Sequence, residues 1–540
     1  MTSPTIIPVI DLFAGPGGLN EGFSYEDHSG LRFKSVLSIE KDKDAHATLE
    51  LRAFFRYFSY NAQKVPKEYY AYLRGAISKE TLFKKYPNAA EAAMHEAYRA
   101  ILGNDEKGNP GTPDVEIQDK ITKALNGERN WLLIGGPPCQ AYSIVGRSRS
   151  LGGIMAKEGI SSEDAHMIFD TDPRQELYKQ YLKILAIHSP AVFVMENVRG
   201  ILSARVHGQL IFTNILKDLR EPYKAMSIAT GQVIPKNGYR IFSFVTGKEP
   251  TNNTEYLIKA EEYGLPQARH RVILLGIRND IAEKIKSIKA LVKHTPMSVK
   301  EAIADLPELR SGFTDKEDTL GNWKNYLSFV TTQQWMTQLP SEVQQVISNA
   351  LLVREKKTLR TKVIDCSYDA SRTPRLGDCW YADESLTCYP NHEARNHMKA
   401  DLRRYLFVAA YGQALKHSPL LHDFPTLLLP EHKNVLHRGD NGGQKFADRF
   451  KVQLANEPSS TITSHISKDG HYFIHYDPVQ CRSLTVREAA RLQTFPDNYF
   501  FEGNRTEQYH QVGNAVPPYL AKLLADVVRD IFRQILVIES

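Results

Sequence analysis

The chain contains few cysteines and no long apolar run. Five cysteines occur in 540 residues, and so sparse and odd a set argues against a disulfide framework. No apolar stretch approaches the roughly 20 residues that a membrane-spanning helix needs. The first residues, 1–11, carry no basic region ahead of an apolar core, so they do not resemble a secretory signal. These absences predict a cytoplasmic protein.

An excess of one charge sign is also missing. Lysine and arginine number 68 against 62 aspartates and glutamates, which leaves a net charge of +6, and charged residues make up 24%. This balance excludes a disordered tail, and it permits a polyanionic partner without establishing one. With 42% hydrophobic residues the chain can bury sizeable cores, and its length predicts two lobes or more.

Short apolar runs alternate with helical patterns in the first half of the chain. The runs are 9–10, 35–39, 131–134, 191–195 and 271–275, and a helical pattern covers 175–188. Each run is continuous rather than alternating, as in strands that are buried on both faces. The alternation of strands and helices predicts an α/β fold with a doubly wound, mostly parallel sheet.

Two segments depart from this rhythm. Residues 61–128 have helical patterns at 68–73 and 91–102, and we interpret them as a helical insertion in the sheet domain. After about residue 285 the rhythm is lost, and turn-rich, charged segments predict a second lobe over 286–500. The last segment, 501–540, contains an amphipathic helix over 518–536.

A glycine loop follows the first apolar run. Gly15, Gly17 and Gly18 let the backbone approach a ligand closely, and Glu40 follows Gly18 after 22 positions, where an acid binds ribose hydroxyls in dinucleotide folds. The loop is neither G-x-G-x-x-G nor a Walker site, and it carries no cation to offset a pyrophosphate. This pattern favours an adenosine cofactor without phosphates, S-adenosylmethionine.

Two reactive side chains end later apolar runs. Cys139 follows the rigid turn 135–138, which contains Pro137 and presents a side chain rather than burying it. Apolar packing is the better interpretation of the other cysteines, Cys366, Cys379, Cys388 and Cys481. Glu196 ends the next run, where a carboxylate is costly unless it is used or paired, although an acid that caps a helix is the ordinary alternative.

Together these motifs resemble the cytosine-C5 DNA methyltransferase family, of the prokaryotic restriction-modification or defence type. The matching segments are 13–18, 136–140, 196–198, 267–271, 484–496 and 511–517, in the family's order and spread over almost the whole chain. The resemblance implies a discontinuous catalytic domain, 1–285 with 501–540, into which a smaller target-recognition domain, 286–500, is inserted. It also implies phage defence or host-DNA protection as the biological role.

The resemblance implies a role for each catalytic residue. Cys139 would add to C6 of a flipped cytosine, and C5 would then take the methyl group of S-adenosylmethionine. Glu196 would bind or protonate N3, and Arg271 would hold O2. Arg269 would serve the site or a nearby phosphate, and Asn197 would orient the loop. No metal is needed.

The resemblance also implies a set of cofactor residues. They are Phe13, Ala14, Gly15, Gly17, Gly18, Glu40, Pro137, Asn514 and Val516, with Glu40 on the ribose and the last two at the methionine end. The acid that contacts adenine is displaced by the insertion 61–128, and Asp119 is the candidate. Lys41 departs from the family pattern, which has an apolar residue after the ribose acid.

The second lobe would face double-stranded DNA. The loop 437–444 and its flanking cations Lys433, Lys445, Arg449 and Lys451 suit groove and phosphate contacts, and a second basic group is Arg372, Arg375, Arg395, Arg403 and Arg404. Each set could equally be a solvated surface. His465, His471 and His475 do not follow a known zinc spacing, and we expect a hairpin that turns at 469–470 instead.

Two other functions remain open at this stage. One branch of the family methylates transfer RNA, but its Cys-Phe-Thr element is missing here and about 200 residues separate Arg271 from Leu484. A non-catalytic DNA-binding regulator is the other alternative, but the first strand begins by Val9 and leaves no room for a helix-turn-helix before it. We expect a monomer, with a restriction nuclease or defence proteins as further partners.

Overall fold

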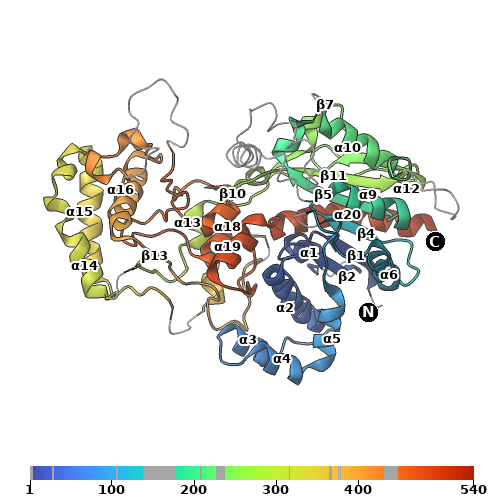
Figure 1. The fold of residues 1–540 in the computed structure, drawn as a ribbon, viewed down its shortest axis with the longest axis horizontal. Coiled ribbons are helices and arrows are strands. Elements are labelled where there is room, and N and C mark those ends of the chain that lie inside the picture. Colours follow the sequence, from blue (N-terminus) through green and yellow to red (C-terminus); the bar gives the residue numbers. More distant parts are fainter. Residues whose placement is uncertain are drawn as a thin grey trace.

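The computed structural model describes residues 4–26, 30–104, 108–137, 177–206, 209–226, 238–314, 317–363, 368–374, 376–377, 379–430 and 448–539. Figure 1 shows a sheet with helices on both faces and, at the opposite end of the long axis, a smaller helical lobe. Within these ranges every helix is too short or too polar to cross a membrane.

The main sheet has eight strands. They are β1 (Thr5–Leu12), β2 (Leu31–Glu40), β3 (Ala97–Arg99), β4 (Leu132–Gly135), β5 (Val192–Val198), β8 (Tyr239–Ser243), β9 (Leu257–Lys259) and β11 (His270–Arg278). Their order is β3-β2-β1-β4-β5-β11-β8, and β9 also pairs with β11. All five apolar runs lie in or along these strands. The pairs from β3 to β5 are parallel, as predicted, but β11 runs antiparallel to β5 and to β8.

Helices cover both faces of the sheet, so the doubly wound α/β prediction is confirmed. One face packs against α1 (Gly18–Phe23) and α20 (Pro518–Glu539), the helix expected over 518–536. The other face packs against α6 (Asp114–Leu125), α9 (Leu177–His188) and α10 (Ile211–Arg220). The short helix α11 (Pro222–Ala225) packs against α9 and α10, and α12 (Asn279–Ala282) contacts β8 and β11 (Figure 1).

The expected helical insertion is shorter than predicted. After α2 (Lys43–Tyr60), the chain forms α3 (Lys67–Leu73), α4 (Lys79–Lys85) and α5 (Pro87–Glu96). The helix predicted over 91–102 ends at Glu96, because Ala97 begins β3, which pairs in parallel with Ser38–Glu40 of β2. β3 and α6 therefore belong to the sheet domain proper, and only 61–96 is inserted.

The smaller lobe is built on three helices, α14 (Leu320–Ser328), α15 (Ser341–Lys356) and α16 (Lys399–Leu415), around a core that includes Trp323 and Phe407. Between the lobe and the sheet lie α13 (Val299–Ile303), α18 (Val486–Leu492) and α19 (Arg505–Asn514) (Figure 1). Short strands and 3-10 helices connect these parts: β6 (Arg205–Val206), β7 (Gln209–Leu210), β10 (Gln267–Ala268), β12 (Gly312–Phe313), β13 (Asn396–His397), β14 (Ser459–Ser460), η3 (Arg199–Leu202), η4 (Asn253–Tyr256), η5 (Ala260–Glu262), η6 (Phe329–Thr332), η7 (Gln334–Gln338), η8 (Ala370–Arg372), η9 (Leu421–Asp423), η10 (Thr426–Leu428) and η11 (Ser464–Ser467).

The hairpin expected around 469–470 does not form. The chain there forms η11 and a turn in which Gly470 has φ 76°, and Ile474 then makes isolated bridges to Val452 and Ser483. Two of the three histidines are buried and form hydrogen bonds within the chain: His471 bonds the Tyr405 hydroxyl at 2.8 Å, and His475 Nδ1 accepts from Asp477 N at 3.1 Å. In the described part of the chain, no cluster of His, Cys, Asp and Glu could hold a metal ion.

Candidate active site at the carboxyl edge of the sheet

The parallel strands bring the predicted residues to one edge of the sheet. Leu12 of β1 pairs with Ile39 of β2 and with Gly135 of β4, and Gly135 pairs with Met195 of β5. The residues that follow these partners are Phe13, Glu40, Gly136 and Glu196, so all four leave the sheet at its carboxyl edge. In open α/β sheets this edge is where ligands bind.

Glu196 forms an ion pair with Arg271, which enters the same edge from the antiparallel strand β11. Arg271 Nε lies 2.8 Å from Glu196 Oε1, and each side chain is 13% exposed. Burial lowers the pKa of Arg271, and the Glu196 carboxylate offsets part of that change. Arg271 also donates to the His270 carbonyl at 2.8 Å. The pair is thus partly desolvated yet open to a ligand.

Gly136 lies against the free end of this pair. A Cβ atom at Gly136 would be 2.9 Å from Glu196 Oε2, so a larger residue would push the carboxylate aside. Asn197 Nδ2 lies 3.5 Å from the Pro137 carbonyl, the contact expected of a residue that orients the loop. Cys139 itself lies outside the described residues, but the loop that carries it starts beside Glu196.

Arg269, which the resemblance assigned to the site or a nearby phosphate, interacts electrostatically with Glu196 and Arg271 but points its donors inward. Its guanidinium is 2% exposed and donates to the carbonyls of Ile462, at 2.7 Å, and Gly513, at 3.2 Å. Burial, with Arg271 as a second cause, holds the pKa of Arg269 well below its usual value. Arg269 therefore binds two distant segments together and does not face a phosphate, because its donors point inward.

Gln267 has a similar role that its motif alone did not reveal. Its side-chain carbonyl accepts from Ile462 N at 2.7 Å, and its amide donates to the Leu492 carbonyl at 3.1 Å and to Gln493 Oε1 at 2.9 Å. It is fully buried. Gln267 and Arg269 thus tie the active-site strand to three segments that follow the helices of the second lobe, at Ile462, Leu492–Gln493 and Gly513.

The glycine loop is a left-handed turn that Glu40 holds in place. Phe13 has φ 56°, Gly15 has φ 55° and Gly17 has φ 93°. Glu40 accepts from Gly15 N and from Asp42 N, both at 2.8 Å. Burial raises the pKa of Glu40 despite these two amide bonds, which favour the charged form.

The glycines of the loop differ in what surrounds the position of a Cβ atom. A Cβ at Gly18 would lie 2.1 Å from the Val516 carbonyl, and one at Gly17 would lie 2.8 Å from a Leu49 methyl group. The chain itself fills these spaces. Around a Cβ at Gly15 no described atom lies within 4 Å, so Gly15 is the position at which a ligand can approach the backbone.

The carboxyl-terminal segment returns to this loop. Val516 packs on Gly18, and the Tyr499 hydroxyl donates to the Pro16 carbonyl. Asn514, the last residue of α19, is exposed beside it. Ala14 N bonds the Ile39 carbonyl at 3.1 Å. Residues from both ends of the chain therefore meet at this edge of the sheet, and Tyr499 is a contributor that its sequence pattern did not reveal.

Asp119 lies on the wrong side of its helix for contact with adenine. Ile117, Ile121 and Leu125 form the buried face of α6, whereas Asp119 is 55% exposed and pairs with Lys123 at 2.6 Å. The loop after β3 reaches the sheet edge instead, where Ala100 N bonds the Glu40 carbonyl at 3.2 Å. The adenine assignment of Asp119 is thus not supported.

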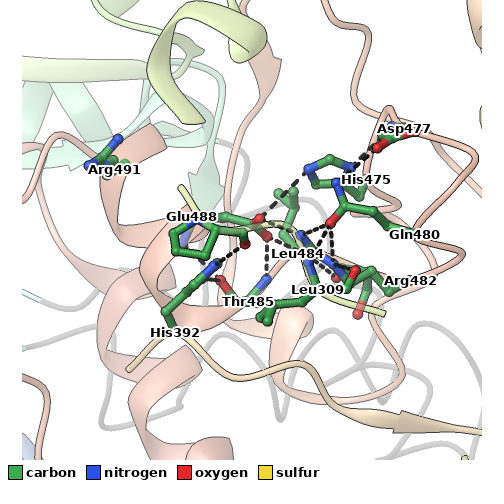
Figure 2. A network of polar contacts seen from close by, with 12 residues as sticks. Leu309, His392, His475, Asp477, Gln480, Arg482, Leu484, Thr485, Glu488 and Arg491 are labelled. Atoms are coloured by element: carbon green, nitrogen blue, oxygen red, sulfur yellow. Dashed lines mark hydrogen bonds and ion pairs between the residues drawn. The ribbon is translucent and has the colours of Figure 1, made fainter. Parts of the chain in front are cut away.

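A buried polar network supports the junction with the second lobe (Figure 2). Glu488 of α18 accepts two bonds from Arg482, both at 2.6 Å, and one from Thr485 N at 2.7 Å. Burial alone would raise the pKa of Glu488, but Arg482 outweighs it and holds that pKa far below its usual value. Burial lowers the pKa of His475 and of His392, each to about 4.

The basic candidates of the second lobe have mixed positions. The loop 437–444, with Lys433, Lys445 and Arg375, lies outside the described residues. Arg395 and Arg404 donate to backbone carbonyls within the lobe, and Arg403 lies 4.6 Å from the Tyr326 ring centroid, so these three support the lobe rather than form a solvated face. Arg372 is exposed in η8, and Arg449 lies 3.9 Å from Asp469.

Comparison with known proteins gives consistent matches. The family model described as C-5 cytosine-specific DNA methylase matches residues 92–226 and 251–530. The chain is 32% identical over 538 residues to Type II methyltransferase M.Bpa9945I of Bacillus paralicheniformis, covering 97% of this chain and 98% of that one. It is 25% identical to Type II methyltransferase M.DdeI of Desulfomicrobium norvegicum, covering 98% and 89%. With DNA (cytosine-5-)-methyltransferase M.ApeKI of Aeropyrum pernix it shares 26% identity, covering 82% and 92%.

Proposed function

The chain belongs to the C-5 cytosine-specific DNA methylase family, and from this premise we propose that it is a site-specific DNA (cytosine-5)-methyltransferase of a restriction-modification or phage-defence system. The family prediction is thereby confirmed. The observation that carries the proposal is the Glu196–Arg271 pair, held at the carboxyl edge of the sheet beside the start of the Cys139 loop.

In the proposed reaction, Cys139 forms a temporary covalent bond to the target cytosine. The target base leaves the duplex stack, at a cost of a few kcal/mol, before it reaches the site. The Cys139 thiolate forms a bond to C6, and the C5–C6 double-bond electrons become available at C5. C5 would then take the methyl group, while the electrons of the broken sulfur–methyl bond would remain on the cofactor's sulfur. Water would accept the C5 proton, the electrons of that C–H bond would re-form the C5–C6 double bond, and the C6–sulfur bond would break to restore the Cys139 thiolate. Covalent catalysis thus replaces one difficult step with two easier ones.

The ion pair supplies the acid-base chemistry of this sequence. Glu196 binds N3 and stabilises the charge that develops on the ring when the sulfur adds, while Arg271 holds O2. In the structure Arg271 engages Glu196 Oε1, and Oε2 faces Gly136, where the nucleophile loop begins. Asn197 steadies that loop through Pro137.

The glycine loop fits a cofactor that is cationic and lacks phosphates. Gly15 leaves room beside the backbone, Glu40 offers a carboxylate for ribose hydroxyls, and the loop has no lysine or arginine. S-adenosylmethionine, when bound, supplies the electrophilic methyl group. Phe13, Ala14, Pro137, Asn514 and Val516 complete the wall of this site in the proposal, and Gly17 and Gly18 shape it through contacts within the chain.

Residues 286–500 would recognise the target sequence in double-stranded DNA, and the monomer would work beside a separate nuclease or defence protein. The curated relatives named above are DNA methyltransferases or Type II methyltransferases. The transfer-RNA alternative is not favoured, since the Cys-Phe-Thr element is missing and about 200 residues separate Arg271 from Leu484. The intact Glu196–Arg271 pair disfavours a non-catalytic regulator.

Bisulfite sequencing of plasmid and host DNA from cells that express the protein tests the proposal. We expect methylcytosine at one recurrent short sequence with the natural chain and none with Cys139→Ser. The matched control is Cys379→Ser, because Cys379 is an exposed free cysteine outside the site, and it should methylate normally. Equal methylation by Cys139→Ser would refute the nucleophile, and methylation of RNA alone would refute the DNA substrate.

A further inference from the structure

Helix α3, in the inserted segment 61–96, contacts two segments that flank α16 of the second lobe, one before it and one after it. Toward the carboxyl-terminal side, the Tyr69 hydroxyl donates to the Asn498 carbonyl at 3.3 Å, and the Tyr72 hydroxyl donates to Glu502 Oε1 at 2.6 Å. Between these two partners lies Tyr499, whose hydroxyl bonds the cofactor loop at Pro16. One side of α3 is therefore attached to the wall of the cofactor site.

The same helix holds a second segment, 383–388, which precedes β13 and α16 of the second lobe. The Tyr70 hydroxyl donates to Asp383 Oδ2 at 2.8 Å, and Arg74 Nη1 donates to Thr387 Oγ1 at 2.8 Å. Leu386 and Cys388 are buried in one apolar cluster with Tyr69 and Leu73 of α3, among other residues. The contact is thus both polar and apolar.

A chain of buried hydrogen bonds joins the two attachments. Asn498 Nδ2 donates to Asp383 Oδ2 at 2.7 Å, and Arg52 Nη1 donates to Asn498 Oδ1 at 2.9 Å. Arg52 Nε in turn donates to Glu21 Oε2 at 2.8 Å, on the helix that starts at Gly18. A shift of segment 383–388 would therefore break bonds that lead directly to the cofactor loop.

We propose that α3 is a positioning element, and Tyr70 a positioning residue, that sets the place of segment 383–388, and with it the second lobe, relative to the cofactor loop. The inference rests on the proposed function, in which the lobe binds DNA across from that loop. A segment that is held in place before association lowers the ordering cost of binding, so a loosened segment 383–388 weakens DNA binding more than it slows the chemical step. The inserted helices thus hold the DNA-recognising part in register with the methyl-transfer site.

The test compares Tyr70→Phe with Tyr86→Phe. Each variant removes the hydroxyl of a tyrosine in the inserted segment, and each hydroxyl bonds a carboxylate. The partner of Tyr70 is Asp383 in segment 383–388, whereas Tyr86 bonds Glu68 within the insertion, at 2.7 Å, and does not reach segment 383–388. The full-length variants are assayed for amide hydrogen exchange over 383–389, and for kcat and KM on plasmid DNA that carries the site found by bisulfite sequencing. A hydrogen bond to a charged group contributes about 1.5–3 kcal/mol.

We expect Tyr70→Phe to speed exchange over 383–389 by about tenfold or more, and to raise the KM for DNA about three- to tenfold with kcat changed less than twofold. Tyr86→Phe should leave all three unchanged. Unchanged exchange over 383–389 would overturn the proposal, and so would faster exchange with an unchanged KM, which would make the contact merely structural. If the natural chain methylates no DNA, the proposed function fails, and the exchange result still decides whether α3 holds the segment.

Discussion

Glu196 and Arg271 depend on each other at the active edge of the sheet. A carboxylate and a guanidinium, each 13% exposed, would be costly to bury singly, because a partly desolvated charge needs a partner. Arg271 also fixes the direction of Glu196, so that Oε2 faces Gly136 and the start of the nucleophile loop. In the proposed function, this fixed geometry preorganises the pair for a neutral ring that gains charge during the reaction.

We expect Glu196→Gln to lower kcat by about 10²–10⁴-fold, the usual contribution of general acid-base catalysis. Glutamine keeps the shape and one hydrogen-bonding oxygen but cannot donate and retrieve a proton at N3. The measurement is single-turnover methyl transfer to plasmid DNA. Glu261→Gln is the control, because Glu261 bonds His270 at 2.7 Å next to the same strand. A loss of less than tenfold would contradict the role of Glu196.

The sequence alone was sufficient to place a site residue where its position at the end of a strand decides where its side chain lies. Glu40, Glu196 and Gly136 each follow an apolar run, so a parallel sheet brings them to one edge. Asp119 and Arg269 could not be placed in this way. The adenine-contacting acid was misplaced because β3, the strand before α6, has only three residues and follows directly on a helix, so no apolar run marked its end. The direction of the Arg269 side chain depends on its bonds to Ile462 and Gly513, which are about 200 positions away.

Among the elements, α1 and α20 form the closest helix contact of the sheet domain. A Cβ at Gly22 of α1 would lie 2.3 Å from the Pro518 carbonyl and 2.4 Å from Lys522 N of α20. The two helices therefore touch through their backbones. This contact lets the carboxyl-terminal segment reach Gly18 and the cofactor loop.

We predict that Gly22→Ala lowers the free energy of unfolding by about 1–3 kcal/mol, because overpacking forces the two helices apart. It should also weaken S-adenosylmethionine binding, since α1 starts at the cofactor loop. Urea unfolding and calorimetric titration measure the two effects. In Gly321→Ala, a Cβ in the first turn of α14 meets open space, so stability should stay equal or rise by up to about 1 kcal/mol. Equal stability of both variants would disprove the close contact.

Strand and helix positions followed from apolar periodicity, but their directions and some turns did not. Continuous burial marks β11 as a strand without showing that it runs antiparallel to β5. The turn at Gly470 was predicted as a hairpin because Asp-Gly favours one, yet the flanking residues bond to Val452 and Ser483 instead. Partners that are remote in sequence decide such pairings, and one sequence does not reveal them.

The whole molecule is held together at α18 by charges that are fully buried. Glu488 is bonded by Arg482, and Arg491 pairs with Asp497 at 2.8 Å and with Asp305 near α13. Buried pairs of this kind add little net stability, but the loss of one partner costs about 3–5 kcal/mol. The loss of Arg482 or Arg491 would therefore leave a buried carboxylate unpaired at the junction between the second lobe and the sheet.

This junction also makes stability depend on pH. Burial lowers the pKa of His392 to about 4, whereas an unfolded histidine has a pKa near 6.5. The unfolded chain therefore binds more protons than the folded one between about pH 6.5 and 4. The contribution of His392 to the free energy of unfolding is complete above about pH 7 and is lost as the pH falls. Linkage gives about 2 kcal/mol lost by pH 5 for this one group. Burial raises the pKa of Asp11 well above its usual value, so the contribution of Asp11 to the free energy of unfolding rises as the pH falls. This change offsets part of the stability that the histidine loses.

A comparison of variants separates His392 from that opposing group. His392 bonds Thr485 Oγ1 at 3.0 Å and the Pro307 carbonyl at 2.8 Å, and His392→Gln keeps polar groups there that do not titrate. We expect His392→Gln to be less stable than the natural chain at pH 7 and to lose about 2 kcal/mol less between pH 7 and pH 5, as measured by urea unfolding. Because Asp11 titrates alike in both chains, its contribution cancels in the difference. Parallel stability curves over this range would show that His392 is not held neutral by burial, and would place the acid sensitivity elsewhere in the molecule.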